Sequence, residues 1–451
     1  MKKILLLTTF LVSACSVTPD YARPDVATPA AYREQVAAGE AVTKDWWQKF
    51  GSTELNTLMT KALVDNNDIR AAIARVEQAR ATVTATGATL LPTVDASGGA
   101  SFNRTDPPSA KADTTRRASI GIDAAYELDL FGANRANVTA AKADERATEF
   151  DRDALALTVM GDVAQNYFNL VNTRERIASA EKNLGLVQQT LKIIQTRYDA
   201  GAISGLELAQ QKTQVAGTQA SLASLQQSET ILLNALGVLT GEPPQNVNVA
   251  ANSLTNLTVP SIDAGLPASL LERRPDIAAA EQALIAANAD IGIARAAFFP
   301  SVNLSTGFDI SKSPIGDPAT TALSIAAALA QPIFHGGAIK AGVERASARQ
   351  TELIENYRKT ILIAFQEVED ALTAVKTAQI RNTQLTAAAQ TSQAAYDIAQ
   401  KRYDAGLVDF QTLLDAQGTL LNAEDAQTES RADLLNASVA LYKALGGGWG
   451  A

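Results

Sequence analysis

Apolar and polar residues alternate along four short segments of the chain, at 93–102, 118–129, 302–310 and 323–329. In each segment, nearly every second residue is apolar, and the residues between them are mostly small, hydroxylated or acidic, as in a β-strand with two different faces. Stretches rich in Pro, Ser and Asp, at 103–117 and 311–321, join the segments in pairs. The pattern therefore predicts two β-hairpins.

The length of these strands separates two interpretations. A small antiparallel sheet could cover a core with one face and meet water with the other. Strands of about ten residues, however, match the 9–11 that cross a bilayer obliquely, with side chains facing lipid and lumen in turn. Four such strands cannot close a barrel, and lipid does not tolerate an open sheet edge. The chain is therefore expected to oligomerise. Two copies would give an eight-stranded barrel filled by side chains, whereas three copies would leave room for a passage.

Long helical stretches follow each predicted hairpin. Residues 133–198 and 338–403 contain no proline and are rich in Ala, Gln, Glu, Lys and Leu, which favour helices. At about 1.5 Å per residue, each stretch would reach roughly 100 Å. A second helix carries Leu413, Leu420, Leu434 and Leu441, which follow a seven-residue repeat with Gln427 at the one position that lacks a leucine. Such a heptad repeat is typical of left-handed helix packing. The spacing fits a rod or a tube wall, and the adjoining membrane strands favour the tube.

The chain also repeats itself. The pentapeptide at 197–201, Arg-Tyr-Asp-Ala-Gly, recurs at 402–406, so the two copies lie 205 residues apart. The same offset pairs Val163 with Val368, and Leu236 with Leu441. Solenoid repeats are only about 20–50 residues long. The sequence therefore predicts a duplicated half-molecule, in which each copy carries one hairpin and its long helices.

The first residues have the layout of a secretory signal, with two lysines, an apolar run from Ile4 to Val12 and small residues before Cys15. This is the only cysteine in the chain, so it has no disulfide partner within it. The segment resembles a bacterial lipobox, in which the cysteine becomes the acylated first residue of the mature protein. Ser16 follows in place of the aspartate associated with retention in the inner membrane. A buried or chance thiol is the alternative.

Charge and motifs exclude several functions. The formal charge is −9, and removal of Lys2 and Lys3 with the signal leaves 37 basic against 48 acidic residues, a charge of −11. Nothing in such a chain neutralises phosphates, so we expect no nucleic-acid partner. We find no phosphate-binding glycine loop or nucleophile elbow, and therefore expect neither an enzyme nor a cofactor. His335, the only histidine, lacks companions at ligand spacing, so no metal site is predicted and a strand-to-helix turn is the simpler place for it. No helix of the mature chain is expected to span a bilayer.

Several short motifs, in their order along the chain, resemble those of the outer-membrane factors of tripartite efflux systems, the TolC-like channels, and especially their lipoprotein members similar to OprM and NodT. Any one of them is weak evidence, but the order and the duplication together are specific. They are Trp46-Trp-Gln-Lys-Phe50, Leu91-Pro92, Tyr126-Glu-Leu-Asp-Leu-Phe-Gly132, Glu272-Arg-Arg-Pro-Asp-Ile277, Phe299-Pro300, Gln331-Pro-Ile-Phe334 and Leu413-Leu-Asp-Ala-Gln417.

The resemblance implies a homotrimer that combines a membrane β-barrel with an α-helical barrel. Each subunit would supply four strands and long coiled helices, giving a twelve-stranded barrel in the outer membrane, a twelve-helix periplasmic tunnel and an equatorial collar. The expected order along the chain is a signal peptide at 1–14, an acylated N-terminus and equatorial segment at 15–68, a first repeat at 69–241 with its hairpin at 93–130, an equatorial insert at 242–276, a second repeat at 277–446 with its hairpin at 301–334, and a flexible tail at 447–451.

The resemblance also implies where the channel closes. In this family the periplasmic helix tips narrow the pore and meet a periplasmic adaptor, and here these tips are the repeated segments at 197–205 and 402–409. The motif places Asp415, Gln411, Arg402 and Tyr403 at the periplasmic gate. The family often has an apolar side chain in place of Gln411, which speaks against an apolar gate layer here. The tips expected to contact the adaptor contain Arg197, Tyr198, Gly201, Gly205, Gly406 and Asp409. Ordinary surface ion pairs are the alternative for the two arginines.

These expectations combine into one function, that of a lipid-anchored exit channel in the outer membrane. It would serve as a passive conduit for drugs or other toxic small molecules, with an adaptor (membrane fusion) protein and an inner-membrane transporter as partners. A periplasmic adaptor-type lipoprotein is the alternative, although an adaptor would normally have one helical hairpin. A duct for metal ions or secreted polypeptides also stays open, while nothing supports a lipid-anchored enzyme.

Overall fold

A computed structural model describes residues 16–34, 39–106, 108–109, 112–312 and 318–449. Cys15, the predicted acylation site, lies outside these residues. The chain divides into two compact units. The first comprises residues 1–26, 74–149 and 279–358, and the second comprises 27–73, 150–278 and 359–451. Each unit therefore takes segments from both sequence repeats.

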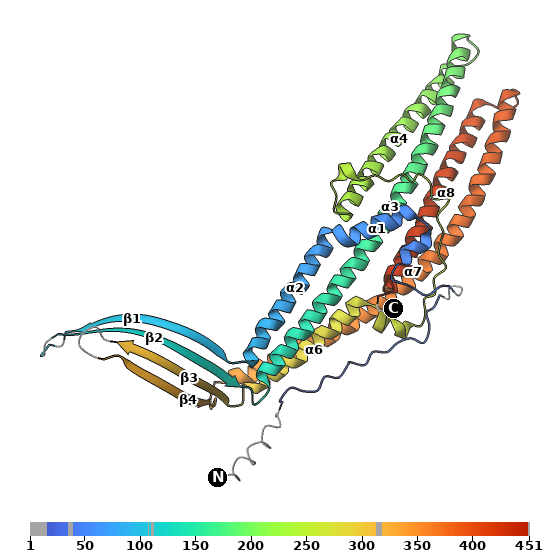
Figure 1. Ribbon diagram of the computed structural model, residues 1–451. Helices are drawn as coiled ribbons and strands as arrows, with labels where there is room; N and C mark the ends of the chain where they lie inside the picture. Colours follow the sequence, from blue (N-terminus) through green and yellow to red (C-terminus); the bar gives the residue numbers. More distant parts are fainter. Residues whose placement is uncertain (1–15, 35–38, 107, 110–111, 313–317, 450–451) are drawn as a thin grey trace. The chain divides into compact units, whose positions relative to one another are not determined.

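The first unit contains one antiparallel sheet in the order β1-β2-β3-β4, and Figure 1 shows its strands side by side. The strands are β1 (Thr93–Thr105), β2 (Asp113–Leu128), β3 (Ser301–Lys312) and β4 (Thr320–Ala330). The predicted hairpin loops at 103–117 and 311–321 were too long, because β1 and β2 stay paired up to Thr105 and Asp113. Polar residues alternate there with other polar residues, so hydropathy gave no sign that the strands continue.

The register of the sheet aligns all four apolar faces. Ala96 lies opposite Ile122, Ile122 opposite Phe308, and Phe308 opposite Leu323. Directly opposite residues of an antiparallel pair point to the same side of the sheet. The predicted alternation of each strand therefore gives one continuous apolar face and one continuous polar face.

The duplication reappears in the helices. Helices α3 (Ala133–Asp199) and α7 (Ala338–Asp404) have 67 residues each, and α4 (Gly205–Leu239) and α8 (Phe410–Ala444) have 35 each. Helices α7 and α8 start and end 205 residues after α3 and α4, so the bounds of the two repeats align without a gap in this region. The predicted long helices end one residue later than expected. The remaining helices are η1 (Trp46–Phe50), α1 (Thr53–Asp65), α2 (Asn67–Gly87), η2 (Ala88–Leu90), η3 (Pro244–Asn246), η4 (Pro267–Ser269), α5 (Leu270–Arg273) and α6 (Pro275–Ala296).

Helix α6 is, among the described residues, the one helix whose length and composition would allow it to cross a membrane. Half of its most apolar window is nevertheless buried inside the structure. Ala286 and Ala289 of α6 pack against Ala140 and Ala143 of α3. Its apolar composition is thus explained by close packing between helices, in which small residues let two backbones approach.

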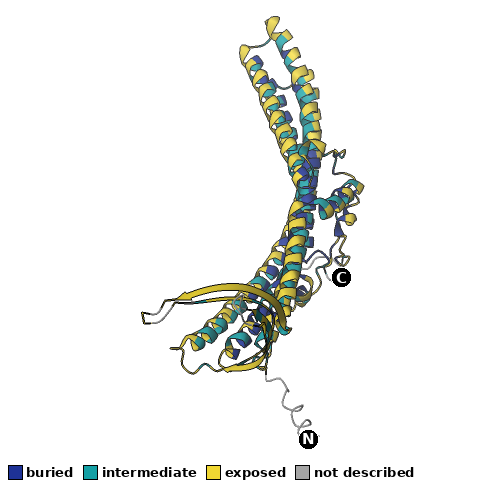
Figure 2. Ribbon diagram, turned by 60° about the vertical axis from the view of Figure 1, so that its left-hand side comes forward, coloured by how far each residue is buried: buried dark blue, intermediate teal, exposed yellow. Residues whose placement is uncertain are grey.

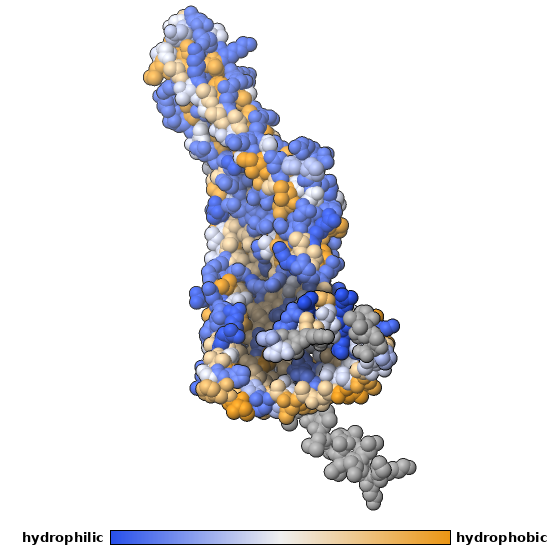
Figure 3. Space-filling model, turned by 90° about the vertical axis from the view of Figure 1, so that its left-hand side faces the viewer, coloured by the Kyte–Doolittle hydropathy of each residue, from blue (hydrophilic) through white to orange (hydrophobic). Residues whose placement is uncertain are grey.

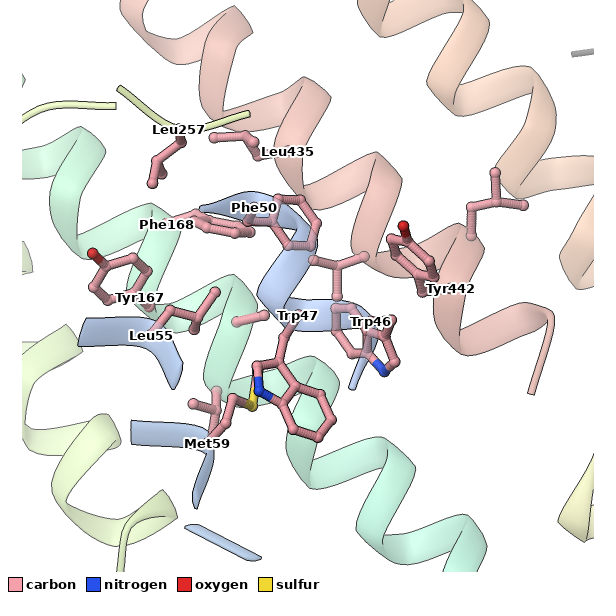
Figure 4. Packing of buried hydrophobic residues seen from close by; sticks show 14 of the residues in the cluster. Trp46, Trp47, Phe50, Leu55, Met59, Tyr167, Phe168, Leu257, Leu435 and Tyr442 are labelled. Carbon is pink, nitrogen blue, oxygen red and sulfur yellow. The ribbon is translucent and has the colours of Figure 1, made fainter. Parts of the chain in front are cut away.

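The main hydrophobic core lies in the second unit and is built around aromatic rings (Figure 4). Trp46, which is fully buried, stacks on Tyr442 with ring centroids 5.0 Å apart. Phe50 packs against Phe168 at 4.9 Å. The motif Trp-Trp-Gln-Lys-Phe is thus a plug of apolar rings, which joins the N-terminal segment to helices α3 and α8.

Residues 446–449 are packed against the protein, in contrast to the predicted flexible tail at 447–451, of which 450–451 lie outside the described residues. Gly446, Gly447 and Gly448 are buried, and Trp449 donates a hydrogen bond from Nε1 to Asp153 at 2.9 Å. All three glycines have positive φ, and a Cβ on Gly447 would lie 2.2 Å from Leu157. Glycine is needed here for tight packing and left-handed backbone, and composition alone does not separate that need from mobility.

Candidate functional site

The apolar face of the sheet is uncovered. Val94 is 67% exposed, Ile120 65% and Ile325 82%, and Figure 2 shows the strands as exposed along most of their length. Figure 3 shows hydrophobic atoms gathered along the lower edge of the molecule, in the region of the sheet. Contiguous apolar surface of this kind marks contact with protein or membrane.

The polar face carries carboxylates and very small residues. Asp95, Asp123, Gly307 and Ser324 form one row across the four strands. Asp123 accepts a hydrogen bond from Ser97 at 3.4 Å, and a Cβ added to Gly307 would lie 2.6 Å from its carboxylate. Glycine at 307 therefore gives the Asp123 carboxylate room on the face that would meet water.

An apolar and aromatic girdle lies where the strands meet the helices. Phe131 stacks on Phe299 with ring centroids 4.6 Å apart, and Ile333 and Phe334 are 89% and 88% exposed. The backbone N–H of Val17 donates to the carbonyl of Phe131 at 3.4 Å. Membrane barrels carry aromatic residues at the level of the lipid headgroups. The N-terminal segment is therefore held beside the girdle.

The helix tips reverse direction through left-handed glycines. Gly201 and Gly406 have φ of 69° and 71°. At each tip the N–H of the residue after this glycine donates a hydrogen bond back across the turn. Ala202 donates to the Arg197 carbonyl at 2.9 Å, and Leu407 donates to the Arg402 carbonyl at 2.8 Å. These bonds satisfy the last carbonyls of α3 and α7.

The two following helices begin with different caps. Ser204 forms a capping box with Glu207 at the start of α4, and Asp409 accepts from the Thr412 N–H at 2.9 Å at the start of α8. The Thr412 hydroxyl also donates to Asp409 at 2.6 Å, and this bond together with that from the Thr412 N–H lowers the pKa of the Asp409 carboxyl. Gly205 is the first residue of α4 and lies outside the left-handed region, so the chain reversal does not use it.

Two contacts connect the helical hairpins of the two repeats. The Arg197 guanidinium donates to Tyr403 Oη at 3.0 Å and lies 5.4 Å from the centre of the same ring. Gln210 on α4 donates to Gln411 on α8 at 3.2 Å, and Gln411 in turn donates to Asp415 at 2.8 Å. Arg197 thus contacts an aromatic ring rather than a carboxylate. Of the four predicted gate residues, Tyr403 and Gln411 make these contacts between hairpins, and Asp415 is bonded to Gln411 on its own helix.

A family model described as "Outer membrane efflux protein" matches residues 58–242 and again 266–447, which together cover most of the chain. The chain belongs to the outer membrane efflux protein family. The double match reproduces the two sequence repeats.

Outer membrane efflux proteins of known role are similar over the full length. The pyoverdine export outer membrane protein OpmQ of Pseudomonas aeruginosa is 38% identical, with coverage of 100% of this chain and 97% of the relative. The cation efflux system protein CusC of Escherichia coli is 32% identical over 97% of this chain and 96% of the relative.

Solved channels of the family share the fold. The outer-membrane channel OprN superposes with a TM-score of 0.87 at 30% identity, over 96% of this chain and 100% of that one. The CmeC outer membrane channel of Campylobacter jejuni gives a TM-score of 0.89 at 28% identity, over 96% and 95%. The fold predicted from the sequence, a strand sheet combined with long helices in an outer-membrane efflux channel, is confirmed.

Within this family fold, three of the predicted site residues make no direct contact between hairpins that the described residues show. Arg402, Tyr198 and Asp415 are exposed, and Asp415 is connected to the other hairpin only through Gln411. Figure 2 shows exposed and half-buried surface at the tips. Exposure within one chain leaves these side chains free to meet another chain.

The sequence reasoning missed Gln210 and Phe410. Gln210 is the counterpart of Asp415 at the 205-residue offset, so comparison of the repeats would have found it. Phe410, the counterpart of Gly205, is buried and packs at 5.8 Å from the Tyr403 ring. Phe410 belongs to a hydrophobic cluster with Ile194, Leu208 and Leu413. Tyr403 packs against this cluster, which orients its ring toward Arg197.

Within the described ranges, no group of three or more His, Cys, Asp or Glu side chains could hold a metal ion. His335 lies in the turn between β4 and α7, beside the positive-φ Gly336 and Gly337. The similar proteins named above are efflux and export proteins of the outer membrane.

Proposed function

We propose that this chain is one third of a homotrimeric exit duct, which carries small molecules from a periplasm-spanning pump through the outer membrane. The barrel would contain twelve strands, four from each subunit. The helices α3, α4, α7 and α8 would line a twelve-helix periplasmic tunnel. In this proposal the duct is a passive conduit, and an inner-membrane transporter supplies the energy.

The sheet carries this proposal. β1 and β4 each have one neighbour, so the sheet has two open edges. A single subunit would leave these backbone groups unpaired in lipid, which costs several kcal/mol for each group. Pairing β4 of one subunit with β1 of the next removes every edge at once and turns all apolar faces outward.

The size of the barrel favours three subunits. Eight strands enclose an interior that side chains fill, whereas twelve leave a passage. The polar rows with Asp95, Asp123 and Gly307 would then face water inside the barrel. Small residues along these rows keep the lumen wide.

We place the gate at the helix tips, where Arg402, Tyr403, Gln411 and Asp415 lie. Contacts between hairpins, from Arg197 on α3 to Tyr403 on α7 and from Gln210 on α4 to Gln411 on α8, support a closed arrangement, because the α7–α8 hairpin cannot swing away from the α3–α4 hairpin without losing them. Three Asp415 carboxylates near a threefold axis would repel each other, so hydrogen bonds such as that from Gln411 must hold them.

The tips are also the surface that we propose for docking of a periplasmic adaptor. Arg197, Tyr198, Gly201, Gly406 and Asp409 lie at the ends of the hairpins, with Gly205 beside them at the start of α4. Adaptor binding would then compete for, or displace, the contacts that close the pore. An inner-membrane transporter would complete the pump.

We infer that Cys15 is acylated and anchors the subunit to the inner leaflet of the outer membrane. The hydrogen bond from Val17 to Phe131, beside the girdle, supports this placement, since it brings the chain within two residues of Cys15 to the membrane boundary. Cys15→Ser should abolish incorporation of labelled palmitate and leave trimers intact, because barrel closure rather than the lipid holds the assembly. Label that persists in the variant would refute the acylation.

Two measurements separate the duct from a periplasmic adaptor. A duct inserted into planar bilayers should give discrete conductance steps, and outer-membrane fractions should contain trimers that resist heating in SDS. An adaptor would give neither. The cargo is proposed only as a class, small molecules, because similar proteins are named for pyoverdine, solvent and cation efflux.

A further inference from the structure

The outward face of the sheet ends in a group of cations. Arg104 and Phe102 lie two residues apart on β1, Phe102 lies opposite Arg116 of β2, and Ala118 lies opposite Lys312 of β3. Residues opposite each other, or two apart on one strand, share a face. Arg104, Arg116 and Lys312, here called the basic patch, therefore lie on the same face as Ile120 and Ile122, at the hairpin end.

The members of the basic patch are close neighbours. Adjacent strands lie about 4.8 Å apart, and positions two apart on one strand about 7 Å, so Lys312 and Arg116 are diagonal neighbours, as are Arg116 and Arg104. Arg116 covers the ring of Phe102 at 5.5 Å from the ring centroid. Three long side chains can thus converge on one group of a few ångströms.

The patch carries more positive charge than its surroundings neutralise. Arg104 pairs with Asp106 at 3.0 Å. Arg116 and Lys312 have no acidic partner within 4.0 Å among the residues that the structure describes, and both are exposed. In Figure 3, which faces the hairpin end of the sheet, strongly hydrophilic atoms lie around the hairpins. A lipid-facing cation is costly at the middle of a bilayer and tolerated at its interface.

We propose that the basic patch binds the phosphate groups of a phosphorylated lipid in the outward leaflet of the membrane. The proposal rests on the proposed function, which directs the helices into the periplasm and the hairpins outward. Guanidinium groups match phosphate oxygens with paired N–H donors, and the ammonium of Lys312 adds a third charge. The apolar side chains one and two rows below, including Ile120 and Ile122, would contact the acyl chains of the same lipid.

The other face of the same strands provides a control that separates a lipid from free phosphate. Arg117 lies next to Arg116 in the chain but points to the polar face, opposite Ser101. A free anion in water could reach both faces of the sheet. A lipid anchored in the leaflet can reach only the outward one, so Arg117 provides a matched control.

Native mass spectrometry of the detergent-purified assembly would test this. The probes are lipid A with two phosphates, the same lipid without phosphates, and phosphatidylglycerol. The double variant Arg116→Gln with Lys312→Gln should weaken binding of bisphosphorylated lipid A by about tenfold or more, since charge-assisted hydrogen bonds to two cations are lost. Arg117→Gln should bind like the unchanged protein. Phosphate-free lipid should bind weakly to all forms.

Three results would overturn the proposal. Equal binding of bisphosphorylated lipid A to the double variant and to the unchanged protein would show that the basic patch is not the site. Equal loss in Arg117→Gln would show a non-specific charge effect. Preference for phosphatidylglycerol over lipid A would also contradict it, by pointing to a phosphodiester lipid. Conductance in planar bilayers separates failure of this proposal from failure of the proposed function. A double variant that gives normal conductance steps and still binds lipid A as the unmutated protein does rejects the basic patch alone. Unmutated protein that gives no conductance steps rejects the duct.

Discussion

If the proposed gate is correct, individual side chains at the helix tips decide how firmly the duct closes. Asp415 accepts the amide of Gln411, which itself accepts from Gln210 of the other hairpin. A neutral hydrogen bond contributes about 1 kcal/mol, and a bond to a carboxylate somewhat more, so each lost bond shifts a closed–open equilibrium by roughly fivefold or more. A small change of chemistry at one residue, present three times in the trimer, is therefore amplified.

Asp415→Ala should raise the mean single-channel conductance in planar bilayers, because Gln411 loses its acceptor and no longer orients toward Gln210. Asp397→Ala is the matched control. Asp397 accepts an equivalent hydrogen bond from Gln393, four residues earlier on the same helix, at 2.8 Å, and this bond does not link the hairpins. Conductance that rises equally in both variants, or in neither, would argue against a gate at Asp415.

Arg274, from the Glu-Arg-Arg-Pro-Asp segment, braces the second unit rather than the gate. It binds Asp276 at 2.7 Å and Glu367 at 2.6 Å and donates to the Ala444 carbonyl at 3.0 Å. Burial alone would lower the pKa of this guanidinium, but the hydrogen bonds and charges of Asp276 and Glu367 raise it. The charge is thus retained inside the protein by its partners.

Arg274→Ala should destabilise the fold by about 1–3 kcal/mol, less than a fully buried pair would cost, because both acidic partners are partly exposed. The change would appear as a lower denaturation midpoint in detergent. Arg273→Ala, at the exposed neighbouring residue, should leave the midpoint nearly unchanged. If the two variants denature alike, Arg274 is not a brace.

At the residue scale, sequence reasoning located the two helix tips and failed where identity depends on close packing. The tips were located because their pentapeptide occurs twice, and its glycines, Gly201 and Gly406, turn the chain there. The packing of Gly447 on Leu157 and the bond from Trp449 to Asp153 left no periodic signal, since one close approach between distant segments has no pattern in either of them.

At the scale of elements, the two faces of the strands make a prediction with a built-in control. Ile325 and Ser324 are neighbours on β4 that point to opposite sides of the sheet. Ile325→Lys would put a charge into lipid in every subunit, at a cost of about 2–4 kcal/mol each near the bilayer centre, whereas Ser324→Lys would face the lumen. Heat-resistant trimers in the outer-membrane fraction should fall sharply in the first variant and persist in the second. The reverse outcome would mean that the faces are assigned wrongly.

The elements were the most predictable part of the fold. Two-residue alternation identified all four strands, and composition identified helices whose ends proved one residue longer. The hairpin loops were overestimated, because strand pairing at Arg104 and Thr114 depends on backbone hydrogen bonds and not on hydropathy. The caps at Ser204 and Asp409 follow from common sequence preferences at helix starts.

At the scale of the whole molecule, subunit number could not be derived from the chain. Open edges at β1 and β4 require partners, and a passage requires more than eight strands, but several numbers satisfy both conditions. The family relationship supplies the choice of three. The account therefore depends on one claim, that identical subunits share a single wall in the membrane.

The mass of the purified assembly in detergent, measured by light scattering with the detergent contribution subtracted, tests this claim most directly. We expect three times the mass of one mature subunit, unchanged on dilution and in Cys15→Ser. A monomer that stays in solution without detergent once its acyl group is absent would contradict the shared wall, and with it the duct.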